Sequence, residues 1–370
     1  MWIYDSFFEV RGFTVEETRD SLVAGRRLDS FTAYIEKSSV PDLEIPKEFA
    51  KFKSLPSDEN FKAILRAAIL LTKPEKGRTG VFVAVGNSHA SKLGSRYAMY
   101  DMLPGIISYV LDLKGPGAFL SSTCDSFGSM VTMARAYISS GLIDHALLLT
   151  SNLMLEGSDF KPSAILSSNG RCLPFTTLRD GSWPGLGAGG VVISNSRPAG
   201  HGVVGLRSSV TFSAGRDRAS FTAPSIDAQQ SAIEEAWGIA ERDLGRASFI
   251  ECHATGTKIG DSLEIESLKR ALRRDHRIDP LLISASKEFI GHLDSASGLA
   301  SLTRTYDHLL GMVAPKCSPK AKENEDVELM DGKVRLAFGE RLNSQEATAG
   351  VTMNGISGST THIVLEREVL

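Results

Sequence analysis

The sequence predicts a layered α/β protein, and three observations support this fold class. Short apolar runs typical of buried strands alternate with longer helix-like stretches over most of the chain. With 370 residues, 42 % hydrophobic and 23 % charged, the chain is long and apolar enough to form a large packed core. Several strand-like runs lead into small-residue loops that carry a thiol or an imidazole. Functional groups in layered α/β folds collect at the carboxyl ends of strands, so these loops form the candidate site.

The first half of the chain alternates helix-like and strand-like segments. Pro104 is compatible with the first turn of a helix, where its missing N–H has no partner to lose, and Gly141 ends the helix that follows. We expect helices at 61–71, 103–113 and 126–140, and strands at 80–85, 117–121, 146–150 and 189–194.

The second half begins near a stretch with proline and glycine at 196–202. Ser225 or Asp227 is the expected N-cap of its first helix, because short polar side chains satisfy the free N–H groups of a first turn. The expected halves are 1–196 and 197–370, although no sequence repeat relates them. We expect a helix at 227–242, strands at 203–212, 248–252, 282–285, 334–337, 349–353 and 362–365, and an exposed charged loop at 320–331 with Gly332 as the turn into its strand.

Composition excludes several classes of function. The formal net charge is −3 and no long basic run occurs, which argues against a nucleic-acid partner. The N-terminal residues do not follow the pattern of a secretion signal, and no run of about 18 apolar residues predicts a membrane span. The cysteines lack CxxC or zinc-like spacing, so we expect reduced thiols in a cytoplasmic protein with no membrane partner.

Cys124 is the candidate nucleophile. A free cysteine is more often a small buried apolar residue than a reactive group. Cys124, however, lies between an apolar strand-like run and a helix-like run. The free N–H groups and the dipole at the start of a helix favour the thiolate, which is the reactive form. This position favours chemistry on acyl thioesters.

His253 and His292 are the candidate partners of the thiol. Each follows a strand-like run and lies in a loop of small residues with glycine nearby. Three such strand ends can converge on one pocket. A metal site is the competing interpretation of one cysteine and two histidines, but no close pair of ligands is visible, so we expect no metal.

Three charged residues lie near these histidines. Lys287 precedes His292 by one short turn, and its simplest role is a surface charge. Asp261 and Glu264 follow His253 at a spacing that places both on one face of a helix. Their simplest role is a charge cluster at the helix N-terminus.

Five segments, in order along the chain, resemble motifs of the β-ketoacyl synthases, the condensing enzymes of the thiolase superfamily. The resemblance extends from about Thr79 to Leu365. One such match would carry little weight, but five in the family's order are specific. The segments are Gly115-Pro116 with Thr123-Cys124, Arg171 to Phe175 with Arg179-Asp180-Gly181, His253 to Thr257 with Gly260-Asp261, Lys287 to His292 with Ala296 and Gly298, and Gly355 to His362.

The resemblance implies a fold and an assembly. It predicts the thiolase fold, in which two βαβαβαββ halves form five α/β/α/β/α layers, here an N-terminal half with the nucleophile and a C-terminal half with both histidines. Family members are usually dimers, so the implied partner is an identical or a related ketosynthase-like chain. The strand before the nucleophile would pair with its twin across the dimer.

The resemblance also implies a reaction, the decarboxylative Claisen condensation of a Cys124-bound acyl group with a malonyl thioester. His253 and His292 would stabilise the enolate, with Lys287 orienting His292. Backbone N–H groups of Cys124 and Ile356 would form the oxyanion hole. No bound cofactor is expected, since phosphopantetheine arrives on an acyl carrier protein or on CoA. The implied arm-binding residues are Thr255 and Thr257, the implied supporting residues are Asp261 and Glu264, and the implied gate loop contains Gly355, Ile356 and Gly358.

Departures from the family pattern indicate a divergent member in a specialised pathway. Asp125 replaces a small residue after the nucleophile, and Leu186 replaces a glutamate. Ile356 replaces the phenylalanine that gates the acyl pocket in relatives, and Thr360 replaces an asparagine. Two alternatives remain: an acyltransferase that passes the acyl group to an alcohol or amine, and a non-elongating partner in a synthase heterodimer.

Overall fold

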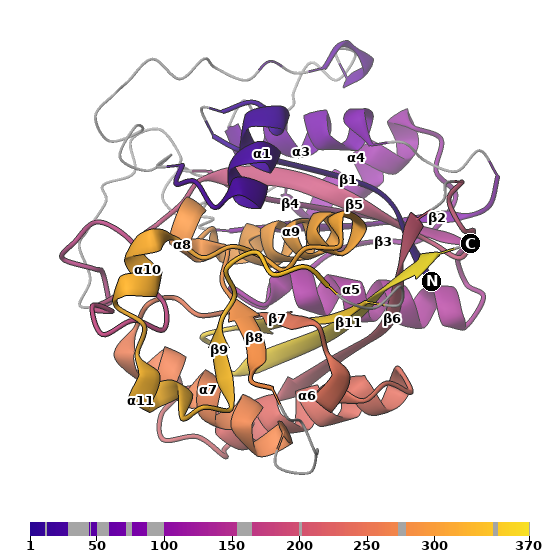
Figure 1. The fold of residues 1–370 in the computed structure, drawn as a ribbon. Helices are drawn as coiled ribbons and strands as arrows, with labels where there is room; N and C mark the ends of the chain where they lie inside the picture. The colour runs from indigo at the N-terminus through magenta and orange to yellow at the C-terminus, as the bar shows by residue number, and fades with distance from the viewer. Residues whose placement is uncertain are drawn as a thin grey trace.

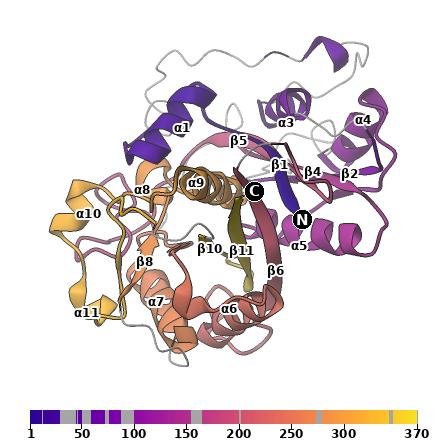
Figure 2. The same cartoon turned by 45° about the vertical axis from the view of Figure 1, so that its right-hand side comes forward.

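The computed structural model describes residues 1–11, 13–28, 44, 46–49, 59–71, 76–86, 100–153, 165–199, 202–272, 279–342 and 347–369. Its strands form one mixed sheet of two similar sets, joined where Trp2 of the first set pairs with Gly205 of the second. Helices lie between the two sets and on their outer faces, which gives five layers (Figures 1 and 2). The thiolase arrangement predicted from the sequence is therefore present.

The first set of strands has the order β3-β2-β4-β5-β1. β2 pairs in parallel with β3 and β4, whereas β5 pairs antiparallel with β4 and β1. The two strands at the centre of this set, β2 and β4, are buried on both faces, which explains their continuous apolar runs. The bounds are β1 (Trp2–Val10), β2 (Thr79–Val85), β3 (Gly117–Phe119), β4 (His145–Asn152) and β5 (Gly187–Ser194).

The second set repeats this topology. Its order is β8-β7-β10-β11-β6, with β9 added beside β8, and its parallel and antiparallel pairings follow the same sequence as in the first set. The expected boundary between the halves at residue 196 lies in the connection from β5 to β6. The bounds are β6 (Gly202–Ser213), β7 (Phe249–Glu251), β8 (Leu281–Ser284), β9 (Val334–Leu336), β10 (Thr348–Asn354) and β11 (Ser359–Val369).

Two helices form the central layer. α5 contacts strands of both sets, and so does α9 (Figure 2). α3 and α4 cover the first set from outside, whereas α6 and α7 cover the second. The bounds are α1 (Val15–Ala24), α3 (Glu59–Leu70), α4 (Leu103–Val110), α5 (Ser126–Ser139), α6 (Ile226–Ile239), α7 (Lys258–Leu272), α8 (Lys287–Ile290), α9 (Ser297–Gly311), α10 (Pro319–Glu323) and α11 (Val327–Met330).

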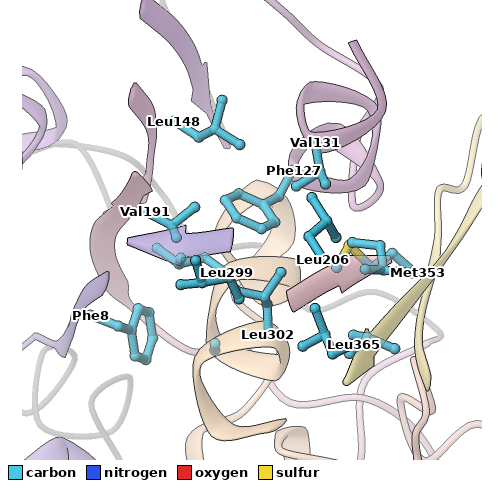
Figure 3. Close-up of a cluster of buried hydrophobic side chains, with 14 of the residues drawn as sticks. Phe8, Phe127, Val131, Leu148, Val191, Leu206, Leu299, Leu302, Met353 and Leu365 are labelled. Atoms are coloured by element: carbon cyan, nitrogen blue, oxygen red, sulfur yellow. The ribbon is translucent and has the colours of Figure 1, made fainter. Parts of the chain in front are cut away.

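The main hydrophobic core surrounds these central helices (Figure 3). Phe127 of α5 and Leu299 of α9 are fully buried, between Leu148 of the first set and Leu365 of the second. Burial of one such side chain contributes about 1.5–3 kcal/mol. Because each central helix packs on both sets of strands, the start of α5 has a fixed position relative to both halves.

Two sequence-based expectations need correction. The stretch 320–331 is not a loop, because it contains most of α10 and all of α11, whose N-caps are Ser318 and Asp326. The N-terminal segment forms the long strand β1, which the sequence pattern did not predict. Gly332, with φ of +66°, does form the expected turn into β9.

Within the described ranges, no helix combines the length and the apolar composition needed to cross a membrane.

Candidate active site

A tight turn between β3 and α5 presents Cys124. Thr123 has φ of +55°, an uncommon conformation for a β-branched residue and one that marks a constrained functional turn. The Ser126 hydroxyl accepts a hydrogen bond from the Ser122 N–H at 2.8 Å and donates to the Thr123 carbonyl at 2.6 Å. Gly355 packs against the turn, and a side chain there would come within 2.7 Å of the Ser122 carbonyl oxygen. The turn therefore fixes the thiol beside the loop that follows β10.

Several groups act on the Cys124 thiol. Burial raises its pKa, the Asp294 carboxylate raises it further, and the positive charge of Lys287 lowers it. The backbone N–H of Ile356 also lowers this pKa. The thiol thus keeps its proton at rest, while the amide of Ile356 and the charge of Lys287 favour the thiolate when it forms.

His292 is the direct partner of the thiol. Its Nε2 lies 3.2 Å from Cys124 Sγ, and its Nδ1 accepts a hydrogen bond from the Asp294 backbone N–H at 3.2 Å. Ser297 Oγ lies 2.8 Å from the same Nδ1. Because Nδ1 is an acceptor, the ring proton is on Nε2 and faces the sulfur. Burial, together with the charge of Lys287, lowers the pKa of His292 to about 3, so the ring is a neutral hydrogen-bond donor.

His253 lies opposite His292, and its ring is likewise a neutral hydrogen-bond donor. The two rings are 5.6 Å apart, centre to centre, and nearly perpendicular at 89°. Lys287 Nζ lies 3.5 Å from His253 Nδ1, which leaves the proton of a neutral His253 on Nε2. Burial lowers the pKa of His253 well below its usual value, with a further contribution from Lys287. Lys287, which the resemblance assigns to His292, has its ammonium group beside His253 and acts on His292 through its charge.

Asp261 and Glu264 on α7 hold the loop that carries His253. Glu264 accepts hydrogen bonds from the backbone N–H groups of His253 and Ala254, at 2.7 and 2.8 Å. Asp261 accepts from Gly256 at 3.1 Å and from Phe175 at 3.0 Å. Both carboxyls are buried, which raises the pKa of Asp261 to about 6 and that of Glu264 to about 7. They are structural groups that fix the loop against the segment around Phe175.

A cavity of about 610 Å³ opens beside these groups. Thr255 and Thr257 line it, with their hydroxyl oxygens 3.2 Å apart. Ile356 lines it as well, and its side chain is 47 % exposed. Of the residues predicted from the sequence, Lys287 and Asp261 lie behind the cavity wall, whereas the wall itself includes Cys124, His253, His292, Thr255, Thr257, Glu264, Gly355, Ile356 and Gly358.

Two departures from the family pattern fit their surroundings. Leu186 is buried in a small apolar cluster with Leu153 and Ala188, where a glutamate would lack compensation. Asp125 is completely buried, and its polar neighbours are the hydroxyls of Ser129, Ser359 and Thr361. Burial raises the pKa of Asp125 to about 7.

Sequence reasoning missed several residues of the site. Asp294, which acts on the thiol, follows His292 by two positions, and that proximity was the available signal. Gln229 and Asn354 line the cavity but belong to no pattern that singles them out. Among the described residues, no group of three or more His, Cys, Asp or Glu side chains is arranged to hold a metal ion.

Comparison with known proteins agrees with this geometry. The sequence matches the β-ketoacyl synthase N-terminal domain over residues 57–199 and the C-terminal domain over residues 204–318. It is 31 % identical over 279 residues to a phenolphthiocerol/phthiocerol polyketide synthase of Mycobacterium tuberculosis, a match that covers 72 % of this chain and 19 % of that protein. It is 29 % identical to polyketide synthase PksM of Bacillus subtilis, over 79 % of this chain and 7 % of that protein. The chain thus spans less than a fifth of the length of these relatives.

Solved structures show the same fold. The ketosynthase from module 1 of the bacillaene synthase of Bacillus amyloliquefaciens superposes with a TM-score of 0.85 at 22 % identity, covering 99 % of this chain and 71 % of that one. An oxazolomycin ketosynthase domain from Streptomyces albus gives a TM-score of 0.82 at 22 % identity, covering 100 % and 74 %. The fold, the cysteine turn and the paired histidines define a condensing-enzyme scaffold. The chain belongs to the β-ketoacyl synthase family.

Proposed function

We propose that this chain catalyses decarboxylative Claisen condensation in polyketide biosynthesis. The observation that carries the proposal is the convergence of Cys124 with two neutral imidazoles on one cavity, His292 Nε2 being 3.2 Å from the sulfur. A nucleophile alone would serve acyl transfer. Two preorganised donors beside it suit a reaction in which a second anion, an enolate, has to be stabilised.

The first step would load the acyl group. The Cys124 sulfur attacks the carbonyl carbon of an acyl thioester, the bond from that carbon to the carrier's sulfur breaks, and the departing thiol takes the proton that Cys124 loses. The Ile356 N–H faces the Cys124 sulfur and, with the Cys124 N–H, would stabilise the oxyanion of the tetrahedral intermediate.

The second step would form the carbon–carbon bond. A malonyl thioester loses carbon dioxide, and the electron pair of the broken bond becomes an enolate whose oxygen accepts from the Nε2–H groups of His253 and His292. The enolate carbon attacks the acyl carbonyl, and the Cys124 thiolate leaves and recovers a proton. Removing one donor of this kind typically costs about 10²–10³ in rate.

The substrates would arrive on phosphopantetheine, carried by an acyl carrier protein or by CoA. Thr255 and Thr257 line the cavity with paired hydroxyls and would hydrogen-bond the arm. The working unit would be a dimer, with an identical or a related ketosynthase-like chain as the second protomer. The cytoplasm remains the expected compartment.

The decisive experiment follows both steps separately. Purified protein is incubated with an acyl carrier thioester, and intact mass reports acylation. A malonyl carrier thioester labelled in its free carboxylate is then added, and released carbon dioxide is counted. We expect acylation followed by release, and neither in Cys124→Ala. Acylation without release, with transfer to an added alcohol or amine, would instead identify an acyltransferase, and no acylation at all would indicate a non-elongating partner in a heterodimer.

A further inference from the structure

The cavity wall contains a short chain of amides and hydroxyls that the condensation chemistry does not use. The Thr360 hydroxyl donates to Asn354 Oδ1 at 2.5 Å, and Asn354 Nδ2 lies 3.3 Å from Gln229 Oε1. Ser267 Oγ lies 3.5 Å from the same Gln229 atom. Gln229, Asn354 and Thr360 all line the cavity.

One end of the Gln229 amide has no partner. Gln229 is 2 % exposed, and its contacts to Asn354 and Ser267 are made by Oε1. Its Nε2 makes no hydrogen bond to any residue in the described part of the chain. The Nε2 atom keeps some accessible surface, which lies at the cavity, so a ligand that displaces water from it has to supply a partner of its own. The free end belongs to a cavity-lining side chain, and the cavity is where a partner can reach it.

A series of contacts connects the Gln229 amide to the turn that presents Cys124. Asn354, which holds Gln229, is the last residue of β10 and directly precedes Gly355. Gly355 packs against the carbonyl of Ser122 in the turn that presents Cys124. A group that reaches Gln229 therefore lies in the same cavity as the Cys124 thiol.

We propose that Gln229 is a specificity-determining residue for oxygen-bearing acyl chains, and that it hydrogen-bonds a hydroxyl group of the acyl substrate. This inference rests on the proposed function and adds its substrate class. A hydroxyl serves whichever way the amide is turned, because it donates to an oxygen and accepts from an N–H. A simple saturated chain leaves the amide unpaired and is disfavoured for that reason.

The test compares octanoyl pantetheine thioesters that carry one hydroxyl, each at a different carbon, with octanoyl pantetheine itself. The rate of Cys124 acylation is followed by intact mass. For at least one hydroxyl position we expect a preference of about 5- to 30-fold over the plain chain. Gln229→Met, which keeps the length of the side chain but removes its polar end, should bring that ratio close to one. Gln230→Leu is the control. The Gln230 side-chain amide donates a hydrogen bond to Glu234 at 2.9 Å, so its removal should leave the preference for the hydroxylated chain unchanged.

The outcomes separate the subsite from the reaction. Wild-type protein that acylates with every chain at one rate overturns the subsite and leaves the condensing function intact. The same holds if Gln229→Met keeps the preference. If none of the thioesters acylates Cys124, the proposed function fails. Equilibrium binding of the same compounds to the wild-type protein then tests the Gln229 subsite separately. Tighter binding of a hydroxylated chain supports the subsite, and equal binding of all chains overturns it.

Discussion

Asp125 is the neighbour of the nucleophile in the sequence, but it is not among the groups that shift the pKa of the Cys124 thiol. Its carboxyl is completely buried next to Cys124 in the sequence, and its polar neighbours are hydroxyls rather than a basic group. The charges that act most on the thiol are those of Asp294 and Lys287. Asp125→Ser should therefore leave the alkylation rate of Cys124 by iodoacetamide unchanged or slightly higher. A large loss would show that the aspartate supports the thiolate.

Asp125 also predicts a dependence of stability on pH. Burial raises its pKa from 3.8 to about 7, so the folded state binds more protons than the unfolded state between these values. Stability contributed by this site is thus full below about pH 4 and is lost as pH rises through about 7, by roughly 4 kcal/mol. The free energy of unfolding of Asp125→Asn should exceed that of the wild type by this amount at pH 8, and by little at pH 4.5. Urea unfolding at both pH values measures it, and an equal difference at both would contradict the burial argument.

Loss of either histidine should slow the condensation step, whereas loss of the cysteine should abolish acylation itself. Both are neutral donors whose main task comes when the enolate forms, so His253→Ala and His292→Ala should reduce condensation by about 10²–10³. Acylation of Cys124, measured by intact mass, should fall much less. His308→Ala serves as a control, because this buried histidine bonds the Val313 carbonyl at 3.0 Å and lies on α9 outside the cavity lining. Near wild-type condensation in both site variants would remove the histidines from the mechanism.

At the scale of single elements, local sequence pattern predicted the buried strands and α5 well, but it did not predict α9, the other helix of the central layer. β2 and β4 are buried on both faces, so their sequences are continuous apolar runs that can be predicted as strands. α9 has serine, threonine and Arg304 among its buried residues, so its sequence does not have the apolar composition expected of a helix in a central layer. β1 was missed because Asp5 and Ser6 interrupt its apolar residues, and its pairing with β5 is non-local.

The site shows the same division. Cys124 and His253 were found because each lies in a small-residue loop after a strand, and His292 because it follows a glycine, although α8 separates it from β8. Lys287 was assigned to His292 through the family resemblance, whereas α8 places the lysine ammonium group beside His253. Gln229 could not be found, because its role depends on contacts with Asn354 and Ser267, which lie far from it in sequence.

The loop between β10 and β11 is the element that should select the acyl chain. Ile356 is β-branched, so its χ1 angle is restricted, and it cannot swing a ring as the phenylalanine of relatives does. Gly358, with φ of +93°, lets the loop pass close to the guanidinium group of Arg218. Ile356→Phe should narrow acceptance toward short acyl groups, with little effect on folding. Acylation rates across chain lengths measure this, and an unchanged profile would place selection elsewhere.

At the scale of the molecule, the two halves share a buried ionic junction. Arg304 of α9 is completely buried and lies 2.8 Å from Glu251 of β7, in the second set of strands. It also donates to the Leu22 carbonyl of α1, at 3.3 Å. Glu251 in turn accepts a hydrogen bond from the Ser286 N–H, at the residue before Lys287. The junction thus connects α1, the central layer and the start of α8, which carries Lys287.

Removal of one partner from this junction should be costly for the whole molecule. Arg304→Met leaves Glu251 buried without its ion-pair partner, and we expect a loss of about 3–5 kcal/mol in the free energy of unfolding. Arg335→Met, which breaks the partly exposed pair with Glu340, should cost less than about 1 kcal/mol. Adding Glu251→Gln to Arg304→Met should recover part of the loss, because the uncompensated charge is then gone. Urea unfolding, followed by tryptophan fluorescence, gives the free energy of unfolding of Arg304→Met, Glu251→Gln, the double variant, the control and the wild type. If the double variant is as unstable as the sum of the two single variants, Arg304 and Glu251 do not interact energetically, and the proposed role of the ion pair is wrong.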